Sequence, residues 1–423
     1  MAQRRVIVVG GGTAGLELAT RLGQSDGCHV TLVDRRTTHL WKPLMHQLAA
    51  GTLDTYEDEI GFIAQARRGN FHYHIGYMHG LNANAKQIRL ASLYDHEGRE
   101  ILPERDLSYD ELVLAVGSIA NDFGTPGVAD HSHFVDNPEG AESFRRDLTA
   151  LLARTWAKPE VGPVRLAIVG GGPTGVELAA EVMHAVEEVR GYGVDMPKPA
   201  IRITLMEASE RILAGVSEDI AEHSHKKLEE IGVTVRTGCR ITGAQMEGLE
   251  LDSGELIDCD LSVWAAGVKA PAWVGELGLP TDKADRVVVD EYLRVTGDVA
   301  DIHAMGDCSA CQEDGNGAPV PARAAAANQQ ASYLASRLVK QPSERERTPF
   351  TYRDKGTLVS IAGYAAYGEI VGLKRNMVQG MTAQLAYASL RRAHQRAILG
   401  SGRTLAIMVS DALRRKAKMK MKL

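Results

Sequence analysis

The sequence is short of cysteine, of long apolar runs and of net charge, and each shortage excludes a class of protein. Its few cysteines are odd in number and scattered, which indicates reduced thiols rather than a disulfide framework: Cys28, Cys239, Cys259, Cys308 and Cys311. No stretch approaches the roughly 18 consecutive apolar residues of a membrane-spanning helix. A net charge of −6 over 423 residues gives no indication of nucleic-acid binding.

What the chain does contain is the composition of a soluble globular protein, with 44% hydrophobic and 24% charged residues. Its length suffices for two or three domains of ordinary size. Met1 is followed almost at once by Arg4, Arg5 and an apolar strand, so we expect no secretory signal peptide. No cluster of His, Cys, Asp or Glu has the spacing of a metal site.

Two glycine-rich turns are the most informative motifs. Each follows an apolar strand and opens a helix, in VIVVGGGTAGLELA and in LAIVGGGPTGVELAAE. The G-x-G-x-x-G positions are Gly10, Gly12 and Gly15 in the first turn and Gly170, Gly172 and Gly175 in the second. Such glycines let the backbone turn tightly and approach a pyrophosphate, which rests on the helix N-terminus. Two turns predict two dinucleotide sites, with one site and one decayed repeat as the alternative.

Each turn has a matching acid at the end of a later strand. Asp34 ends VTLVD and Glu207 ends ITLME, and both are placed to accept hydrogen bonds from ribose hydroxyls. Glu207 is followed by Ala208 and Ser209, so a 2′-phosphate would meet a carboxylate and no adjacent cation; Arg211 is the nearest. The second site is therefore predicted to prefer NADH. A protein with two dinucleotides usually moves electrons between them.

The charge is unevenly distributed along the chain. Residues 391–423 contain ten Lys or Arg and one acid, a net charge of +9, which leaves −15 for the remaining 390 residues. In the same region GRTLAIMVSDALRRKAKMKMKL places Leu405, Met408, Val409 and Leu413 on one helical face. This pattern predicts an interfacial helix on an anionic membrane surface. The alternative is a core-packed terminal helix with a solvated basic end.

Further motifs, taken in order, give the chain a resemblance to a known superfamily. Between the two glycine-rich turns lies YDELVLAVGS (109–118), after the second comes LSVWAAGV (261–268), and then MGD (305–307). This order resembles the two-dinucleotide-binding flavoprotein reductases. The resemblance implies an α/β fold with two Rossmann-like, glutathione-reductase-type domains, the NADH domain inserted in the FAD domain. We expect FAD-binding parts at 1–120 and 286–345, the NADH-binding domain at 163–285, and a C-terminal strand pair with basic amphipathic helices at 346–423.

The superfamily resemblance also implies which residues contact each cofactor. For non-covalent FAD these are Gly10, Gly12, Thr13, Ala14, Gly15, Asp34, Arg35, Lys42, Gly117, Gly306 and Asp307. For NADH they are Gly170, Gly172, Pro173, Thr174, Gly175, Glu177, Glu207, Ala266 and Gly267.

A closer resemblance is to type II NADH:quinone oxidoreductases. HLWKPLMHQLAAGTL (39–53), PARAAAANQQA (321–331), YRDKGTLVSIAGYAA (352–366) and His394 with the basic tail are similar to stretches of that family. The resemblance implies respiratory transfer of electrons from NADH to a membrane quinone without proton pumping, at the cytoplasmic face of the membrane. A homodimer is compatible with it.

The same resemblance implies the catalytic residues: Glu177, Gln329, Gln330 and Lys355. The two glutamines would lie beside the flavin ring and the quinone pocket. Glu177 would lie near the nicotinamide–flavin contact, or else only stabilise the first turn of its helix through the helix dipole. Two departures bear on the quinone side: Ala325 stands where the family usually has Gln, and Tyr387 and Leu390 replace tryptophans common before the C-terminal histidine.

Two other functions compete with this one. A sulfide:quinone oxidoreductase would need redox cysteines flanking the flavin and no intact second nucleotide motif, the reverse of this chain. An NADH-sensing flavoprotein would share the motifs but reduce quinones slowly. Cys308 and Cys311 form a C-x-x-C that could exchange electrons, although structural thiols are the alternative. No cysteine lies between Cys28 and Cys239, which excludes a disulfide-reductase mechanism.

Overall fold

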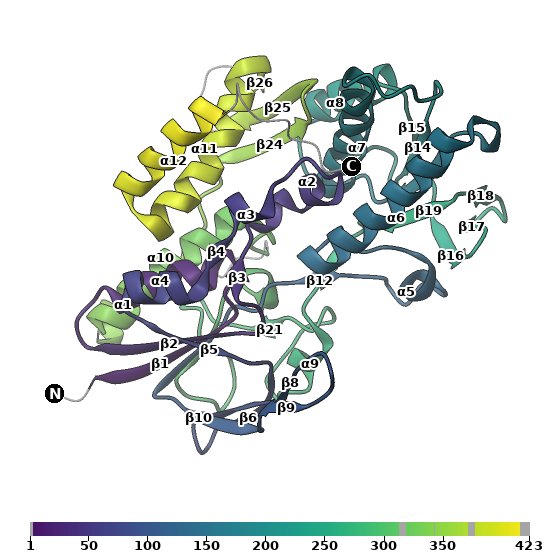
Figure 1. Cartoon of the computed structure of the whole chain (residues 1–423). Helices are drawn as coiled ribbons and strands as arrows, with labels where there is room; N and C mark the ends of the chain where they lie inside the picture. Colours follow the sequence, from purple (N-terminus) through teal and green to yellow (C-terminus); the bar gives the residue numbers. More distant parts are fainter. Residues whose placement is uncertain (1–2, 313–318, 342, 371–376, 415–423) are drawn as a thin grey trace.

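A computed structural model describes residues 3–312, 319–341, 343–370 and 377–414 (Figure 1). Its first domain is built on a parallel sheet whose strand order is β22-β11-β1-β2-β5. The strands are β1 (Arg4–Val9), β2 (Cys28–Asp34), β5 (His72–Ile75), β11 (Glu111–Leu114) and β22 (Ile302–Ala304). Because β22 pairs with β11, the segment after residue 300 returns to the sheet that the N-terminus began.

The strands of this sheet are apolar over most of their length, as expected where helices cover both faces. In β1, Val6 to Val9 are all buried. Helix α1 (Thr13–Gly23) packs against α10 (Ala324–Lys340), and α4 (Phe62–Gly69) lies beside α1. Their buried side chains form one hydrophobic core with the sheet.

The second domain repeats the plan with the strand order β15-β14-β13-β19. These strands are β13 (Val164–Val169), β14 (Ile201–Met206), β15 (Val233–Arg236) and β19 (Leu261–Trp264), all parallel. Helices α7 (Pro173–Gly191) and α8 (Glu218–Glu230) pack on this sheet, and α6 (Pro138–Ala157) leads into it. The second domain is therefore inserted between β11 and β22 of the first.

Smaller elements complete the two domains. Antiparallel sheets follow the main strands: β6 (Met78–Asn82), β7 (Gln87–Leu90) and β10 (Arg105–Ser108) in the first domain, and β16 (Ile241–Gln245), β17 (Gly248–Leu251) and β18 (Leu256–Asp258) in the second. Near the first sheet, the stretch 39–53 folds into the 3-10 turn η1 (Lys42–Leu44) and helix α2 (Met45–Ala49), and α3 (Thr55–Asp58) follows. Helix α2 packs against α6 and α7, so it joins the two domains.

The C-terminal segment forms a third layer beside both domains (Figure 1). It contains β24 (Gly356–Ile361), β25 (Ala365–Ile370), β26 (Met377–Gln379), α11 (Gly380–Leu399) and α12 (Ser401–Arg414). The predicted strand pair is a three-stranded sheet, since β26 adds to β25. Strand β24 packs against α7, and α11 packs against both this sheet and α1.

Helix α12 exposes its predicted apolar face. Leu405, Met408, Val409 and Leu413 are 61%, 46%, 53% and 73% exposed, so these side chains are not packed into the core. Among the described residues, no helix has both the length and the apolarity needed to cross a membrane. The last nine residues of the basic tail, 415–423, lie outside the described residues.

Candidate functional site

The first glycine-rich turn brings helix α1 so close to β1 that side chains are excluded. A Cβ on Gly15 would lie 1.8 Å from the Gly10 carbonyl oxygen, and one on Gly10 would lie 2.4 Å from that of Ala115. Gly12 differs, because a Cβ there would meet no described atom within 4 Å. Gly12 precedes α1, whose start has neither a capping side chain nor an acid in its first turn. Open space and free N–H groups at a helix N-terminus suit a pyrophosphate.

The second turn has the same geometry at the start of α7. A Cβ on Gly175 would lie 2.0 Å from the Gly170 carbonyl oxygen, whereas one on Gly172 would meet no described atom within 4 Å. Pro173 occupies the first helical position, where its missing N–H costs nothing. The chain thus has two equivalent anion cradles, one in each domain.

The two matching acids also occupy equivalent positions. Asp34 accepts hydrogen bonds from the backbone N–H of Gly11 (2.6 Å) and Arg36 (2.8 Å). Glu207 accepts them from Gly171 (2.7 Å) and Ser209 (2.8 Å). Each carboxylate is therefore oriented by the glycine-rich loop itself, at the edge of the cradle. Arg35, between Asp34 and Arg36, is exposed.

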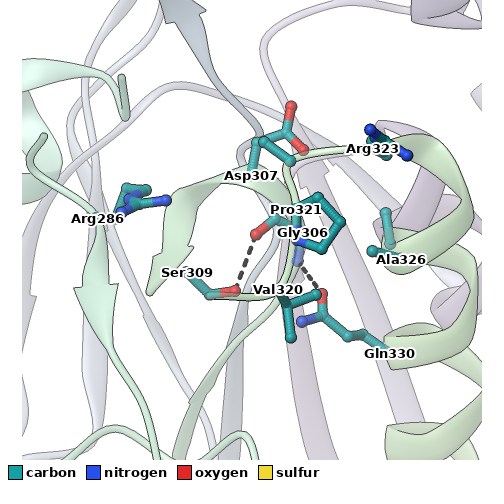
Figure 2. A pocket seen from close by; sticks show the side chains of 11 residues that line it. Arg286, Gly306, Asp307, Ser309, Val320, Pro321, Arg323, Ala326 and Gln330 are labelled. Atoms are coloured by element: carbon teal, nitrogen blue, oxygen red, sulfur yellow. Dashed lines mark hydrogen bonds between the residues drawn. The ribbon is translucent and has the colours of Figure 1, made fainter. Parts of the chain in front are cut away.

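The Gly306–Asp307 turn lies opposite the first cradle. Gln330 on α10 accepts a hydrogen bond from the Gly306 N–H (2.6 Å), and Ser309 donates to the Gly306 carbonyl (2.8 Å), as Figure 2 shows. Gly306 has a φ of +73°, a conformation that glycine adopts without strain. A Cβ there would lie 3.9 Å from Ala327 and 4.0 Å from Ala14, so the turn, α10 and α1 face a common space.

A chain of polar contacts closes this space from the other side. Lys42 donates to the carbonyl and the hydroxyl of Ser118, both at 2.8 Å, and Ser118 donates to Asp307 (2.7 Å). Gly117, next to Ser118, has a φ of +72° and open space at its Cβ position. The residues present fit a dinucleotide cofactor: an uncapped helix end for the pyrophosphate, an acid for a ribose, and small residues along the path between them.

The remaining predicted residues lie farther out. Gln329 is tied to the backbone of Arg353 by two 3.0 Å hydrogen bonds, and Lys355 is exposed just before β24. Ala266 and Gly267 follow β19 in the second domain; a Cβ on Gly267 would lie 2.7 Å from the Phe123 ring.

The sequence predicted Glu177 in the first turn of its helix, and this prediction is wrong. Helix α7 begins at Pro173, so Glu177 lies in the second turn, and the residue is 7% exposed. It accepts a hydrogen bond from the backbone N–H of Ser360 on β24 (3.1 Å) and lies 3.5 Å from His46 on α2. One carboxyl group therefore contacts the second domain, the first domain and the C-terminal layer.

Burial keeps this group of side chains uncharged near neutral pH. It raises the pKa of Glu177 to about 8 and lowers the pKa of His46 to about 4. At pH 7 the contact joins a neutral carboxyl group and a neutral imidazole, not an ion pair. Glu181, one turn further along α7, is also buried and accepts from Thr52 (2.5 Å). Burial raises the pKa of the Tyr387 hydroxyl, which has no hydrogen-bond partner in the described part of the chain.

A second buried contact joins the C-terminal layer to the first glycine-rich turn. His39 Nδ1 lies 2.9 Å from the Gly11 carbonyl oxygen, which only accepts, so this nitrogen has the proton. His39 Nε2 therefore accepts, and His394 Nε2 on α11, 2.9 Å away, donates. Burial lowers both pKa values, that of His39 to about 4, so both rings are neutral. The His394 ring also stacks on Trp41.

The C-x-x-C cysteines lie in the hydrophobic core of the first domain. Cys308 and Cys311 are both buried. Burial raises the pKa of the Cys308 thiol to about 11, and its sulfur donates to backbone carbonyls of Leu114 and Met305. A redox cysteine needs the thiolate form and access to its partner.

Comparison with known proteins gives the chain its family. A family model described as pyridine nucleotide-disulphide oxidoreductase matches residues 4–331. The type II NADH:quinone oxidoreductase of Haemophilus influenzae is 38% identical over 99% of this chain and 100% of its own length. The chain belongs to the type II NADH:quinone oxidoreductase family. That of Staphylococcus aureus is 28% identical over 88% of this chain and 91% of its own. In fold, the chain is similar to NDH2 from Plasmodium falciparum in complex with NADH, with a TM-score of 0.85, 19% identity and full coverage of both chains.

Sequence patterns did not single out the residues that join the two domains to each other and to the C-terminal layer. His39, His46 and Ser360 lie in stretches without a nucleotide motif, and Glu181 ends the stretch quoted for the second motif. The nearest signal was the family-like stretch 39–53, which contains both histidines but gives no partner for either. Ala327 on α10 lies near the Gly306 turn, 3.9 Å from the position of a Cβ on that glycine.

The two cradles predict separable defects. Gly12→Ala and Gly172→Ala each add a methyl group in open space, so the chain should fold normally. Gly12→Ala should purify with much less FAD, and Gly172→Ala should keep its FAD but show a KM for NADH raised by about tenfold or more. Flavin released by acid and steady-state kinetics measure the two effects. Gly15→Ala is the control, since its Cβ overlaps the Gly10 carbonyl and should lower the melting temperature. Full FAD content in Gly12→Ala would contradict the assignment.

Proposed function

We propose that this chain oxidises NADH and reduces a membrane quinone, as a respiratory enzyme that does not pump protons. The observation that supports this best is the pair of equivalent dinucleotide cradles in one chain, one in each domain, in a protein 38% identical to a type II NADH:quinone oxidoreductase. The chemistry supplied by bound FAD is the uptake of two electrons from NADH and their release to the quinone.

The protein's part is to bind and orient. Gly12 and the N-terminus of α1 hold the FAD pyrophosphate, Asp34 holds its ribose, and the Gly306–Asp307 turn bounds the path to the flavin. Gln330 acts through that turn as a positioning residue, because its amide oxygen fixes the Gly306 N–H. Gln329 has a similar part, because it holds the backbone at Arg353. Lys355 remains an exposed cation beside these elements.

The second domain binds NADH in the same way, at Gly172 and the N-terminus of α7. Glu207 stays hydrogen-bonded to the loop and offers its remaining lone pairs to the ribose hydroxyls. A 2′-phosphate would lie beside this carboxylate at a cost of roughly 1–4 kcal/mol for effective dielectrics of 80 to 20. NADH is therefore the donor that we propose.

Glu177 is the proton-holding group of this proposal. Quinone reduction by NADH consumes one proton from solution, and a carboxyl group with a pKa of about 8 is protonated at neutral pH. Its position between α7, α2 and β24 lets it hold a proton where the second domain meets the C-terminal layer. His46, which is neutral, lies 3.5 Å from this carboxyl group.

Helix α12 and the basic tail would attach the enzyme to the cytoplasmic face of the membrane as a peripheral protein. The four exposed apolar side chains of α12 supply buried area, and a net charge of +9 over residues 391–423 supplies attraction to anionic lipid. Pairing of two copies is compatible with this attachment, and sedimentation would measure it.

Sulfide oxidation is disfavoured by the cysteines. A sulfide:quinone oxidoreductase needs accessible redox cysteines beside the flavin, whereas Cys308 is fully buried with a raised pKa. An NADH-sensing role would leave the reduced flavin long-lived in the presence of every quinone.

Rapid mixing without oxygen tests the function directly. NADH should bleach the flavin absorbance of the holoenzyme, and menaquinone or ubiquinone should then restore it within the turnover time. NADPH should bleach it at least about tenfold more slowly. Flavin that stays reduced with both quinones would overturn the oxidoreductase proposal and favour a sensor.

Glu177→Gln tests the proton-holding role. In the wild type the carboxyl group is protonated below its pKa of about 8, so quinone turnover should fall as the pH rises through 8. The variant should lose this step in the pH profile and reduce quinone about a hundredfold more slowly, with bleaching by NADH nearly intact. Equal loss in both half-reactions would mean that the residue only supports the structure.

Stability of the same variant provides the matching control. Burial raises the folded-state pKa of Glu177 above its unfolded value of about 4.5, so the folded protein binds the extra proton. The wild type should therefore lose stability as the pH rises from about 4.5 through 8. Glu177→Gln should show less of this loss in melting temperature.

Truncation after Gly400 tests the membrane attachment. The shortened enzyme lacks α12 and the tail, so it should no longer sediment with anionic vesicles but should still reduce a small water-soluble acceptor. For the full chain, high salt should weaken binding without abolishing it, because the apolar face remains. If the truncated enzyme binds vesicles as tightly as the full chain, the attachment lies elsewhere.

A further inference from the structure

A groove of about 400 Å³ lies where the first domain meets the turn between α11 and α12. Its lining residues come from α4, from the end of α1 and from that turn: Gln24, Gln65, Arg68, Arg396 to Gly400, and Arg403. This volume is in the range of small-ligand pockets. Among the described residues that line it, three are arginines and none is acidic.

The three arginines that line the groove differ from Arg391 and Arg392, because their side chains have no hydrogen-bond or ion-pair partner among the described residues. Arg391 pairs with Asp58, and Arg392 pairs with Asp411. Arg68, Arg396 and Arg403 are exposed, and their side chains have no hydrogen bond or ion pair with another described residue. Three guanidinium groups around one concavity, without a carboxylate, are complementary to a phosphate.

One residue that lines the groove, Gln65, is buried and has a side-chain oxygen that could still accept a hydrogen bond. Gln65 is 1% exposed, and its Nε2 donates to the Ile398 carbonyl (2.8 Å) and to Thr20 (3.2 Å). Its Oε1 has no partner in the described part of the chain. A buried acceptor without a partner is costly, so this oxygen fits a ligand that brings a donor next to its anionic group.

The turn between α11 and α12, which lines the groove, is held in place by its own hydrogen bonds. Gly400 has a φ of +80°, and the buried Thr404 donates to its carbonyl (2.9 Å). Arg403 lies in the first turn of α12, so the positive end of that helix lies at the groove as well. Leu405, exposed, follows two residues later and begins the apolar face.

We propose that this groove binds the headgroup of an anionic phospholipid. The three arginines would hold the phosphate, Gln65 Oε1 would accept from a headgroup hydroxyl, and the acyl chains would lie along the apolar face of α12. A free anion would have no use for that apolar face. The inference rests on the proposed membrane attachment and adds to it a defined lipid site, whereas the charged tail alone would give diffuse attraction.

Binding of a monomeric short-chain lipid distinguishes a defined lipid site from diffuse attraction to the charged tail. The probe is dihexanoyl phosphatidylglycerol below its micelle concentration, titrated calorimetrically into the holoenzyme, with inorganic phosphate in parallel. We expect saturable binding to the wild type and at least about tenfold weaker binding to Arg68→Gln/Arg396→Gln/Arg403→Gln. Because these side chains have no internal partners, the melting temperature of the variant should be unchanged.

The matched control removes the same charge from the tail, in Lys416→Gln/Lys418→Gln/Lys420→Gln. It should bind the short-chain lipid like the wild type while losing affinity for anionic vesicles. Equal lipid binding by the groove variant and the wild type would overturn the site, as would inorganic phosphate binding as tightly as the lipid. Wild-type binding to anionic vesicles without binding of the monomeric lipid would overturn the groove and leave the membrane attachment standing. Lipid binding without vesicle binding would support the groove and overturn the attachment.

Discussion

The close approach of a helix to the end of its own strand is the constraint on which both nucleotide sites depend. Gly15 and Gly175 lie so near the carbonyls of Gly10 and Gly170 that any side chain would separate helix from sheet. This contact aims the uncapped N-termini of α1 and α7 at open space beside Gly12 and Gly172. The same loops fix Asp34 and Glu207 through backbone N–H groups, so turn, acid and helix end form one rigid unit. Two such units in one chain allow a donor and a flavin to be bound independently.

The two units are useful only if they are held at a fixed distance, and buried polar contacts with the C-terminal layer provide this. His394 hydrogen-bonds to His39, which in turn bonds the first glycine-rich loop at Gly11. Glu177, on the helix that begins at the second cradle, bonds Ser360 in the same layer. Each contact is between groups that burial keeps neutral near pH 7, so none of them requires a charge in the interior. The layer that exposes the apolar helix α12 is thereby connected to both nucleotide sites.

Sequence patterns predicted those parts of the fold that depend on residues close together in the chain. Glycine spacing and strand-ending acids located both cradles, and the 3.6-residue period located the apolar face of α12. Contacts between distant segments could not be predicted in this way. His39 and His394 are 355 residues apart, and neither has a neighbour that reveals its partner. Glu177 was placed near a helix start by counting residues. Its hydrogen bond to β24 could not be predicted, because the position of β24 beside α7 is set by tertiary packing. Gln330 was predicted by resemblance, and only the fold shows that it acts on the Gly306 backbone.

The charge of the C-terminal region illustrates the same distinction between composition and structure. As a sum, +9 over residues 391–423 describes an attraction without a direction. In the folded chain Arg391 and Arg392 are neutralised by Asp58 and Asp411 and hold α11 to its neighbours, so they add little to the field outside. The side chains of Arg396 and Arg403 have no partner among the described residues and line a groove with Arg68, a residue more than 300 positions earlier in the sequence. Basic residues close together in sequence therefore divide into those that hold the fold together and those available to a ligand. Under the proposed membrane attachment, only the second group lines a groove in which one lipid could be preferred over another.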